Sequence, residues 1–141
     1  MALQHHIHVL SGPVQGGKTS FIAEKIPQLK ERGLRVGGFL CPGTIAEGRR
    51  TDFRLVNIET GKALPMGNEQ ELKEWSKFRR FYFNPQTFHE GTKWIMESIR
   101  EKPELLVIDE VGPMELEGSG WSDILDFLEN KKDIIQLWIV R

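Results

Sequence analysis

The chain has 141 residues, of which 39% are hydrophobic and 28% are charged, the balance of an ordinary soluble globular protein. Nineteen Lys and Arg against twenty Asp and Glu leave a net charge of -1, so no overall positive field indicates binding to nucleic acid or to an anionic membrane. No apolar run reaches the roughly 20 residues of a membrane-spanning helix, and the first residues lack the pattern of a secretory signal. We therefore expect one domain over residues 1–141, located in the cytoplasm.

Predicted strands and helices alternate along the chain. Short apolar runs predict strands at 7–10 and 36–40, separated by an amphipathic helix at 18–32. A hairpin with a glycine turn is predicted at 53–64, followed by an edge strand at 78–83 and a helix that begins at Asn84-Pro85. A buried strand at 105–108, an amphipathic helix around 121–128 and a last strand at 134–140 complete the order. This alternation predicts an α/β fold with a mainly parallel sheet covered by helices on both faces, and with a β-hairpin insertion.

A complete phosphate-binding loop, or Walker A motif, lies between the first predicted strand and helix. Its glycines let the backbone turn N–H groups toward phosphate oxygens, and the helix that follows points its positive end at the same anion. Lys18 supplies a charge for the terminal phosphates, and Thr19 supplies a hydroxyl for Mg²⁺. With Ser20, the predicted nucleotide-binding residues are Gly12, Pro13, Val14, Gln15, Gly16, Gly17, Lys18 and Thr19.

The strand at 105–108 runs directly into two carboxylates, which is a Walker B pattern. Open α/β sheets bind ligands at the carboxyl ends of their strands, so both side chains are predicted to face the phosphate loop. Asp109 is the candidate for holding Mg²⁺, and Glu110 for activating the water that attacks the terminal phosphate. A strand that simply passes into an acidic loop is the alternative for this pattern taken alone.

These motifs resemble those of the thermophile-type, or cancer-related, nucleoside-triphosphatase family of P-loop NTPases. The resemblance covers nearly the whole chain, and its most specific part is the run Asp-Glu-Val-Gly-Pro-Met-Glu-Leu at 109–116. It implies a three-layer, RecA-like fold and slow, Mg²⁺-dependent hydrolysis of ATP, GTP and other nucleoside triphosphates, with broad base specificity. Glu115 also matches the family pattern, without an assigned role. The resemblance further implies a carboxyl-terminal helix, which a domain ending at Arg141 is expected to lack.

Two weaker signals complete the prediction. A phosphoryl-transfer site needs positive charge for its transition state, and Arg50 is the candidate arginine finger, with a solvated basic face as the alternative. Cys41, the single cysteine, is interpreted as a small core residue at a strand end.

Three functions are compatible with these residues. The first is a nucleoside-triphosphatase in which Lys18, Glu110 and Arg50 are catalytic and Thr19 and Asp109 hold the metal ion. The second is a small-molecule kinase, in which an acceptor pocket replaces the attacking water. The third is a nucleotide-dependent switch or accessory subunit, for which the sequence identifies no protein partner.

Overall fold

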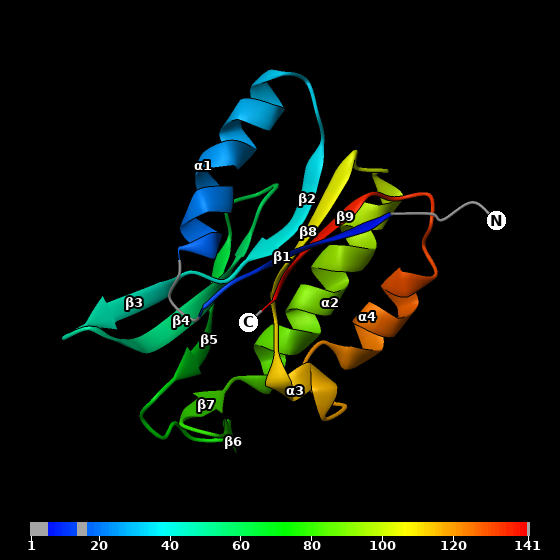
Figure 1. Cartoon of the computed structure of the whole chain (residues 1–141). Helices are drawn as coiled ribbons and strands as arrows, with labels where there is room; N and C mark the ends of the chain where they lie inside the picture. The colour runs from blue at the N-terminus through cyan, green and yellow to red at the C-terminus, as the bar shows by residue number, and fades with distance from the viewer. Residues whose placement is uncertain (1–5, 14–16, 141) are drawn as a thin grey trace.

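The computed structural model describes residues 6–13 and 17–140, and it places the central strands and helices where the sequence predicts them (Figure 1). In chain order the elements are β1 (Ile7–Ser11), α1 (Lys18–Glu31), β2 (Val36–Leu40), β3 (Gly43–Ala46), β4 (Arg49–Asn57), β5 (Ala63–Asn68), β6 (Ser76–Phe78), β7 (Phe81–Phe83), α2 (Pro85–Arg100), β8 (Leu105–Val111), α3 (Pro113–Leu116), α4 (Ser122–Glu129) and β9 (Gln136–Val140). No helix in the described part of the chain is long and apolar enough to cross a membrane.

The nine strands of the described chain form one sheet in the order β1-β9-β8-β2-β4-β5-β7-β6, with β3 paired to β4. Strands β1, β9, β8 and β2 are parallel to one another, whereas β2 pairs with β4 in antiparallel register. The α/β class is confirmed, and the sheet is mixed rather than mainly parallel. The reason is that short connections join the strands from β3 to β5, and a tight turn can join only antiparallel neighbours.

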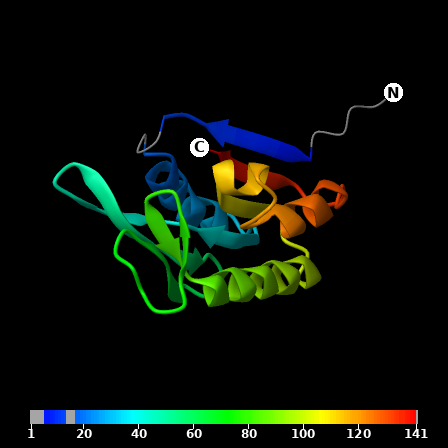
Figure 2. The same cartoon turned by 90° about the horizontal axis from the view of Figure 1, so that it is seen from below.

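Helices cover both faces of this sheet (Figures 1 and 2). On one face, Ile22 and Ile26 of α1 pack against a buried cluster that includes Val107 and Ile139. On the other face, α2 and α4 pack against a second cluster that includes Leu106 and Ile108. Consecutive residues of β8 thus enter opposite cores, which is why its sequence is apolar without alternation.

Two hairpins depart from the sequence-based prediction. The strand expected at 78–83 is instead the β6–β7 hairpin, in which Phe78 pairs with Phe81 and Arg79 occupies the left-handed region with a φ of 57°. The β3–β4 hairpin, which extends from the body of the molecule in Figure 1, was not predicted. Its two-residue turn consists of Glu47 and Gly48, with φ of 53° and 78°, as a type I′ turn requires.

Local sequence explains where α2 starts. Asn84 caps the helix by accepting a hydrogen bond from the Gln86 N–H, and Pro85 follows it at the first helical position, as predicted. The structure also contains the short helix α3 at residues 113–116. This helix was not predicted, because the sequence indicated only that the Walker B segment continues there.

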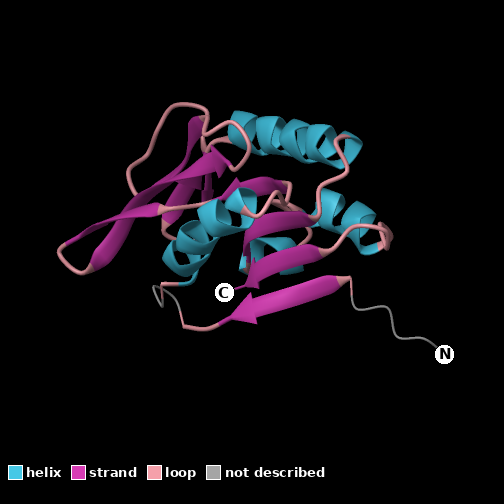
Figure 3. Ribbon diagram, turned by 90° about the horizontal axis from the view of Figure 1, so that it is seen from above, coloured by secondary structure: helices cyan, strands magenta, loops and turns pink. Residues whose placement is uncertain are grey.

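The strands of the sheet lie side by side between the helices (Figure 3), and the parallel ones end at a common edge. Because β1, β8 and β2 are linked through parallel pairings, their carboxyl ends lie on the same side. The phosphate loop follows β1, Cys41 follows β2, and Asp109 and Glu110 are near the end of β8. This is the edge at which open α/β sheets bind their ligands.

Candidate active site

The phosphate loop joins β1 to α1. The Lys18 ammonium lies over the start of the loop, where it donates hydrogen bonds to the carbonyls of Gly12 at 2.8 Å and Pro13 at 3.0 Å. Gly17 precedes the helix in the left-handed region with a φ of 80°, a conformation that favours glycine. The remaining predicted loop residues lie outside the described residues: Val14, Gln15 and Gly16.

Thr19 and Asp109 meet although 90 residues separate them in the sequence. The Thr19 hydroxyl donates to Asp109 Oδ2 at 2.7 Å. The Cys41 N–H donates to the same carboxylate oxygen at 2.8 Å. Ser20 lies in the same first turn of α1 and is exposed. The contact brings the segment of the predicted Walker A motif next to that of the predicted Walker B motif.

The Asp109 carboxyl group is fully buried, and this burial raises its pKa to about 6. The hydrogen bonds from Cys41 and Thr19 oppose the shift, since they favour the charged form. The second oxygen, Oδ1, has no hydrogen-bond partner among the described residues. A buried oxygen without a partner next to a threonine hydroxyl is suited to a hard cation.

The chemistry of these donors fits Mg²⁺. The ion binds oxygen ligands, commonly one or two carboxylates together with the phosphates of the substrate. Among the described residues, no three His, Cys, Asp or Glu side chains gather into a complete metal site. Thr19 and Asp109 are the residues that would hold Mg²⁺ here.

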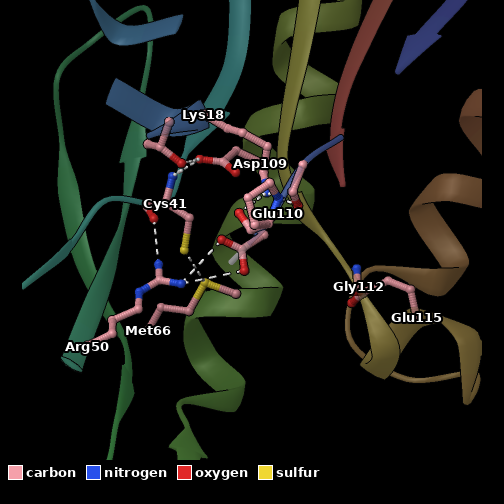
Figure 4. A network of polar contacts seen from close by, with 11 residues as sticks. Lys18, Cys41, Arg50, Met66, Asp109, Glu110, Gly112 and Glu115 are labelled. Atoms are coloured by element: carbon pink, nitrogen blue, oxygen red, sulfur yellow. Dashed lines mark hydrogen bonds and ion pairs between the residues drawn. The ribbon is translucent and has the colours of Figure 1, made fainter. Parts of the chain in front are cut away.

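Glu110 and Arg50 form a charged pair next to Asp109 (Figure 4). The Arg50 Nη1 atom lies 3.2 Å from Glu110 Oε2, and Nη2 donates to the Cys41 carbonyl at 2.8 Å. The guanidinium also stacks on the Phe53 ring, 4.3 Å from its centre. Arg50 is therefore held on three sides and orients the Glu110 carboxylate.

Burial separates Arg50 from the neighbouring arginines of β4. Arg50 is only 8% exposed, whereas Arg49 and Arg54 on the same strand are exposed. A solvated basic face, the alternative considered for Arg50, does not describe this buried residue.

Cys41 has a role that the sequence did not reveal. The interpretation as a core residue at a strand end is confirmed, because the side chain is 2% exposed and contacts the Met66 sulfur at 3.6 Å. The backbone of Cys41 also contacts two residues of the site. Its N–H donates a hydrogen bond to Asp109, and its carbonyl accepts one from Arg50. Burial raises the pKa of the thiol well above its usual value, so the group is a neutral one. Backbone contacts carry no side-chain signature, and no sequence pattern could have identified them.

Glu115 organises the segment after the Walker B strand. One carboxylate oxygen accepts a hydrogen bond from the Gly112 N–H at 2.7 Å, and the other accepts from the Trp121 N–H at 2.9 Å. Burial raises the pKa of this carboxyl group. The residue thus joins the start of α3 to the start of α4, which gives a structural role to a position that the family resemblance left without one.

A pocket of about 430 Å³ adjoins Glu110. Glu110 and Glu115 contribute to its wall, and Arg79 and Arg80 contribute from the β6–β7 turn. Most of the remaining lining consists of aromatic rings: Phe53, Phe78, Phe81, Phe83, Phe88 and Trp121. The sequence did not reveal this pocket, because the rings come from segments far apart in the chain.

Comparisons with known proteins agree with this geometry. A family model described as NTPase matches residues 7–138. The nucleoside-triphosphatase THEP1 of Sulfurisphaera tokodaii is 28% identical over 138 residues, which cover 89% of this chain and 72% of the relative. The corresponding protein of Saccharolobus solfataricus is 31% identical over 120 residues, which cover 84% of this chain and 67% of the relative. The chain thus spans about two thirds to three quarters of the length of these two relatives.

Two solved structures share the fold. The crystal structure of THEP1 from the hyperthermophile Aquifex aeolicus matches with a TM-score of 0.72 and 22% identity, covering 95% of this chain and 76% of the other. The solution structure of a human cancer-related nucleoside triphosphatase matches with a TM-score of 0.70 and 23% identity, covering 94% of this chain and 74% of the other.

The α/β fold with helices on both faces of the sheet, together with the match to the family model, identifies the class of P-loop NTPases. Within that class, the chain belongs to the NTPase family, whose model matches nearly its whole length. The family predicted from the sequence is therefore confirmed, and so is its class of enzyme, the nucleoside-triphosphatases.

Proposed function

We propose that this protein hydrolyses nucleoside triphosphates, ATP and GTP among them, to the diphosphate and phosphate in a Mg²⁺-dependent reaction. The observation that carries the proposal is the 2.7 Å hydrogen bond between Thr19 and Asp109, because this pair is where a P-loop enzyme holds its metal ion. A bound Mg²⁺ would neutralise charge on the terminal phosphates as the bond to the leaving diphosphate breaks.

The protein's own groups have separable tasks in this reaction. Lys18 exchanges its contacts with the Gly12 and Pro13 carbonyls for contacts with phosphate oxygens. Glu110, oriented by Arg50, accepts the proton of the attacking water as its oxygen bonds to the γ-phosphorus.

Phosphate release measured with ATP, GTP, CTP and UTP, with and without Mg²⁺, tests this function. Lys18→Ala should abolish release because the terminal phosphates lose their positive partner, and Glu110→Gln should reduce it about a hundredfold or more while nucleotide still binds. Glu117→Gln, an exposed residue on the same segment, is the matched control and should retain the parent rate. Full activity of Glu110→Gln would remove Glu110 as the base.

The pocket beside Glu110 supports a second candidate, phosphoryl transfer to a small molecule. An acceptor hydroxyl would replace the water, its oxygen bonding to the γ-phosphorus while the bond to the β,γ-bridging oxygen breaks and Glu110 takes the hydroxyl proton. Formation of nucleoside diphosphate that requires an added hydroxyl compound, without release of free phosphate, would favour this candidate over hydrolysis.

A further inference from the structure

The pocket beside Glu110 has the size and lining of a small-molecule site. Its volume of about 430 Å³ falls within the range of about 300–1,000 Å³ that is usual for ligand pockets. It lies at the end of β8 and extends toward α3, so a ligand in it would lie next to the residue that faces the terminal phosphate. Figure 4 shows Glu110 between the Asp109 carboxylate and the segment that carries Gly112 and Glu115.

The aromatic wall of the pocket is packed into a fixed arrangement. Phe53 meets Phe81 edge to face, with centres 5.2 Å apart, and meets Phe83 at 5.4 Å. On the other side, Phe88 packs against Trp121 at 4.7 Å. Rings that hold one another in this way form a stable apolar surface, which favours a flat aromatic ligand over a flexible polar one.

Two guanidinium groups give the pocket a positive side. Arg80 stacks on Phe81 at 4.2 Å and pairs with Glu69 at 3.3 Å, so its charge is already partly balanced. Arg79 is exposed and forms no ion pair with any described residue. It also has a φ of 57°, at a turn position where glycine or asparagine would be less strained. Its guanidinium lies over the Phe78 ring, 5.5 Å from the ring centre. An exposed arginine that lacks an ion pair among the described residues, on a strained turn beside an apolar pocket, is suited to bind an anionic group of a ligand.

We propose that this pocket binds a flat aromatic small molecule that carries an anionic group, with its ring among the phenylalanines and Trp121 and its anion on Arg79. Binding of this ligand does not require nucleotide hydrolysis. Its placement beside the terminal phosphate rests on the function proposed above.

Binding of 2-naphthoate to the full chain without nucleotide tests the inference, with 2-naphthalenemethanol as the uncharged counterpart. Calorimetry would measure both affinities. Arg79→Ala should weaken 2-naphthoate binding about threefold to tenfold and leave binding of the alcohol within about twofold. Arg32→Ala, which replaces an exposed arginine at the end of α1, should change neither affinity.

A second pair of variants locates the site. Met114 lines the pocket from α3, and Met114→Trp should fill it and reduce binding of both compounds at least tenfold. Met114→Phe is a smaller replacement for use if the tryptophan variant does not fold. Lys18→Ala should bind 2-naphthoate as the parent does, because no described residue of the phosphate loop lines the pocket.

The outcomes separate this inference from the proposed activity. Equal 2-naphthoate affinity in the parent and Arg79→Ala, or in the parent and a folded Met114 variant, would overturn the inference. Loss of binding in Lys18→Ala would place the probe in the phosphate loop and overturn it as well, with the hydrolase function unaffected. Binding with the expected pattern in a protein that hydrolyses no nucleotide would support the pocket and refute the hydrolase.

Discussion

Asp109 is a carboxylic acid that its surroundings make costly to ionise. Its pKa is raised to about 6 because the group is buried, whereas an exposed aspartate ionises near 3.8. Between these two values the unfolded chain has released a proton that the folded protein still holds. The free energy of unfolding of the metal-free protein therefore falls as the pH rises through this window, by about 3 kcal/mol at most.

Replacing this acid should stabilise the metal-free protein in a pH-dependent way. Asp109→Asn keeps an oxygen for the Thr19 and Cys41 hydrogen bonds and removes the buried charge. We expect its free energy of unfolding in urea, with EDTA present, to exceed that of the parent by about 1–3 kcal/mol at pH 8 and by little at pH 4. Asp126→Asn, on the exposed face of α4, should show no such trend. An equal difference at both pH values would contradict this origin of the effect.

Arg50 is expected to act on the reaction through Glu110. Arg50→Ala frees the Glu110 carboxylate to take other orientations, so kcat should fall about ten- to hundredfold with little change in KM. Arg50→Lys should recover part of kcat by keeping a positive charge near Glu110. Arg49→Ala, which removes an exposed arginine paired with Glu69, is the neighbouring control. If Arg50→Ala released phosphate at the parent rate, Arg50 would neither orient Glu110 for the reaction nor act as an arginine finger.

At the scale of elements, the packing of α2 against Trp121 and Leu55 depends on the absence of a side chain at Gly91. A Cβ atom there would come within 2.4 Å of the Trp121 ring and 2.8 Å of Leu55. Since both are buried core residues, a methyl group can be accommodated only if the core repacks. The close approach also holds Trp121 in place as part of the pocket wall.

Gly91→Ala should therefore destabilise the protein although alanine favours helices. The substitution gains about 1 kcal/mol in helix propensity, and overpacking of the core costs about 1–3 kcal/mol. We expect a net loss of up to about 2 kcal/mol in urea unfolding. Glu97→Ala on the exposed face of α2 should stay within about 0.5 kcal/mol of the parent. A gain in stability from Gly91→Ala would show that Trp121 moves aside freely.

The whole molecule should be stabilised by its substrate, because the nucleotide site exists only in the folded chain. The Thr19 to Asp109 contact joins β8 to α1 across the sheet, and unfolding of either segment destroys the site. A ligand at a hundred times its Kd adds about 2.7 kcal/mol to the free energy of unfolding.

A non-hydrolysable ATP analogue with Mg²⁺ should raise the Tm of the parent by roughly 5–10 °C, as scanning calorimetry would measure. EDTA should remove most of the increase, and Lys18→Ala should show none. Stabilisation of Lys18→Ala equal to that of the parent would place the nucleotide somewhere other than the phosphate loop.

The sequence by itself determined the features that depend on local backbone and patterning. Glycine spacing predicted the phosphate loop, the apolar run at 105–108 predicted the strand that delivers Asp109 and Glu110, and Asn84-Pro85 predicted the start of a helix. Each of these signals lies within a few residues of the structure that it specifies, so no tertiary contact was needed to interpret it.

Only the tertiary structure decided which distant groups meet. The pairing of Arg50 with Glu110 spans 60 residues, and the pocket combines aromatic rings from β4, β6, β7, α2 and the start of α4. Such contacts depend on strand order and register, and a shift of one residue in a strand would turn each side chain to the other face of the sheet. For this reason the sequence predicted a nucleotide site, whereas the burial of Arg50, the backbone role of Cys41 and the pocket beside Glu110 came from the fold.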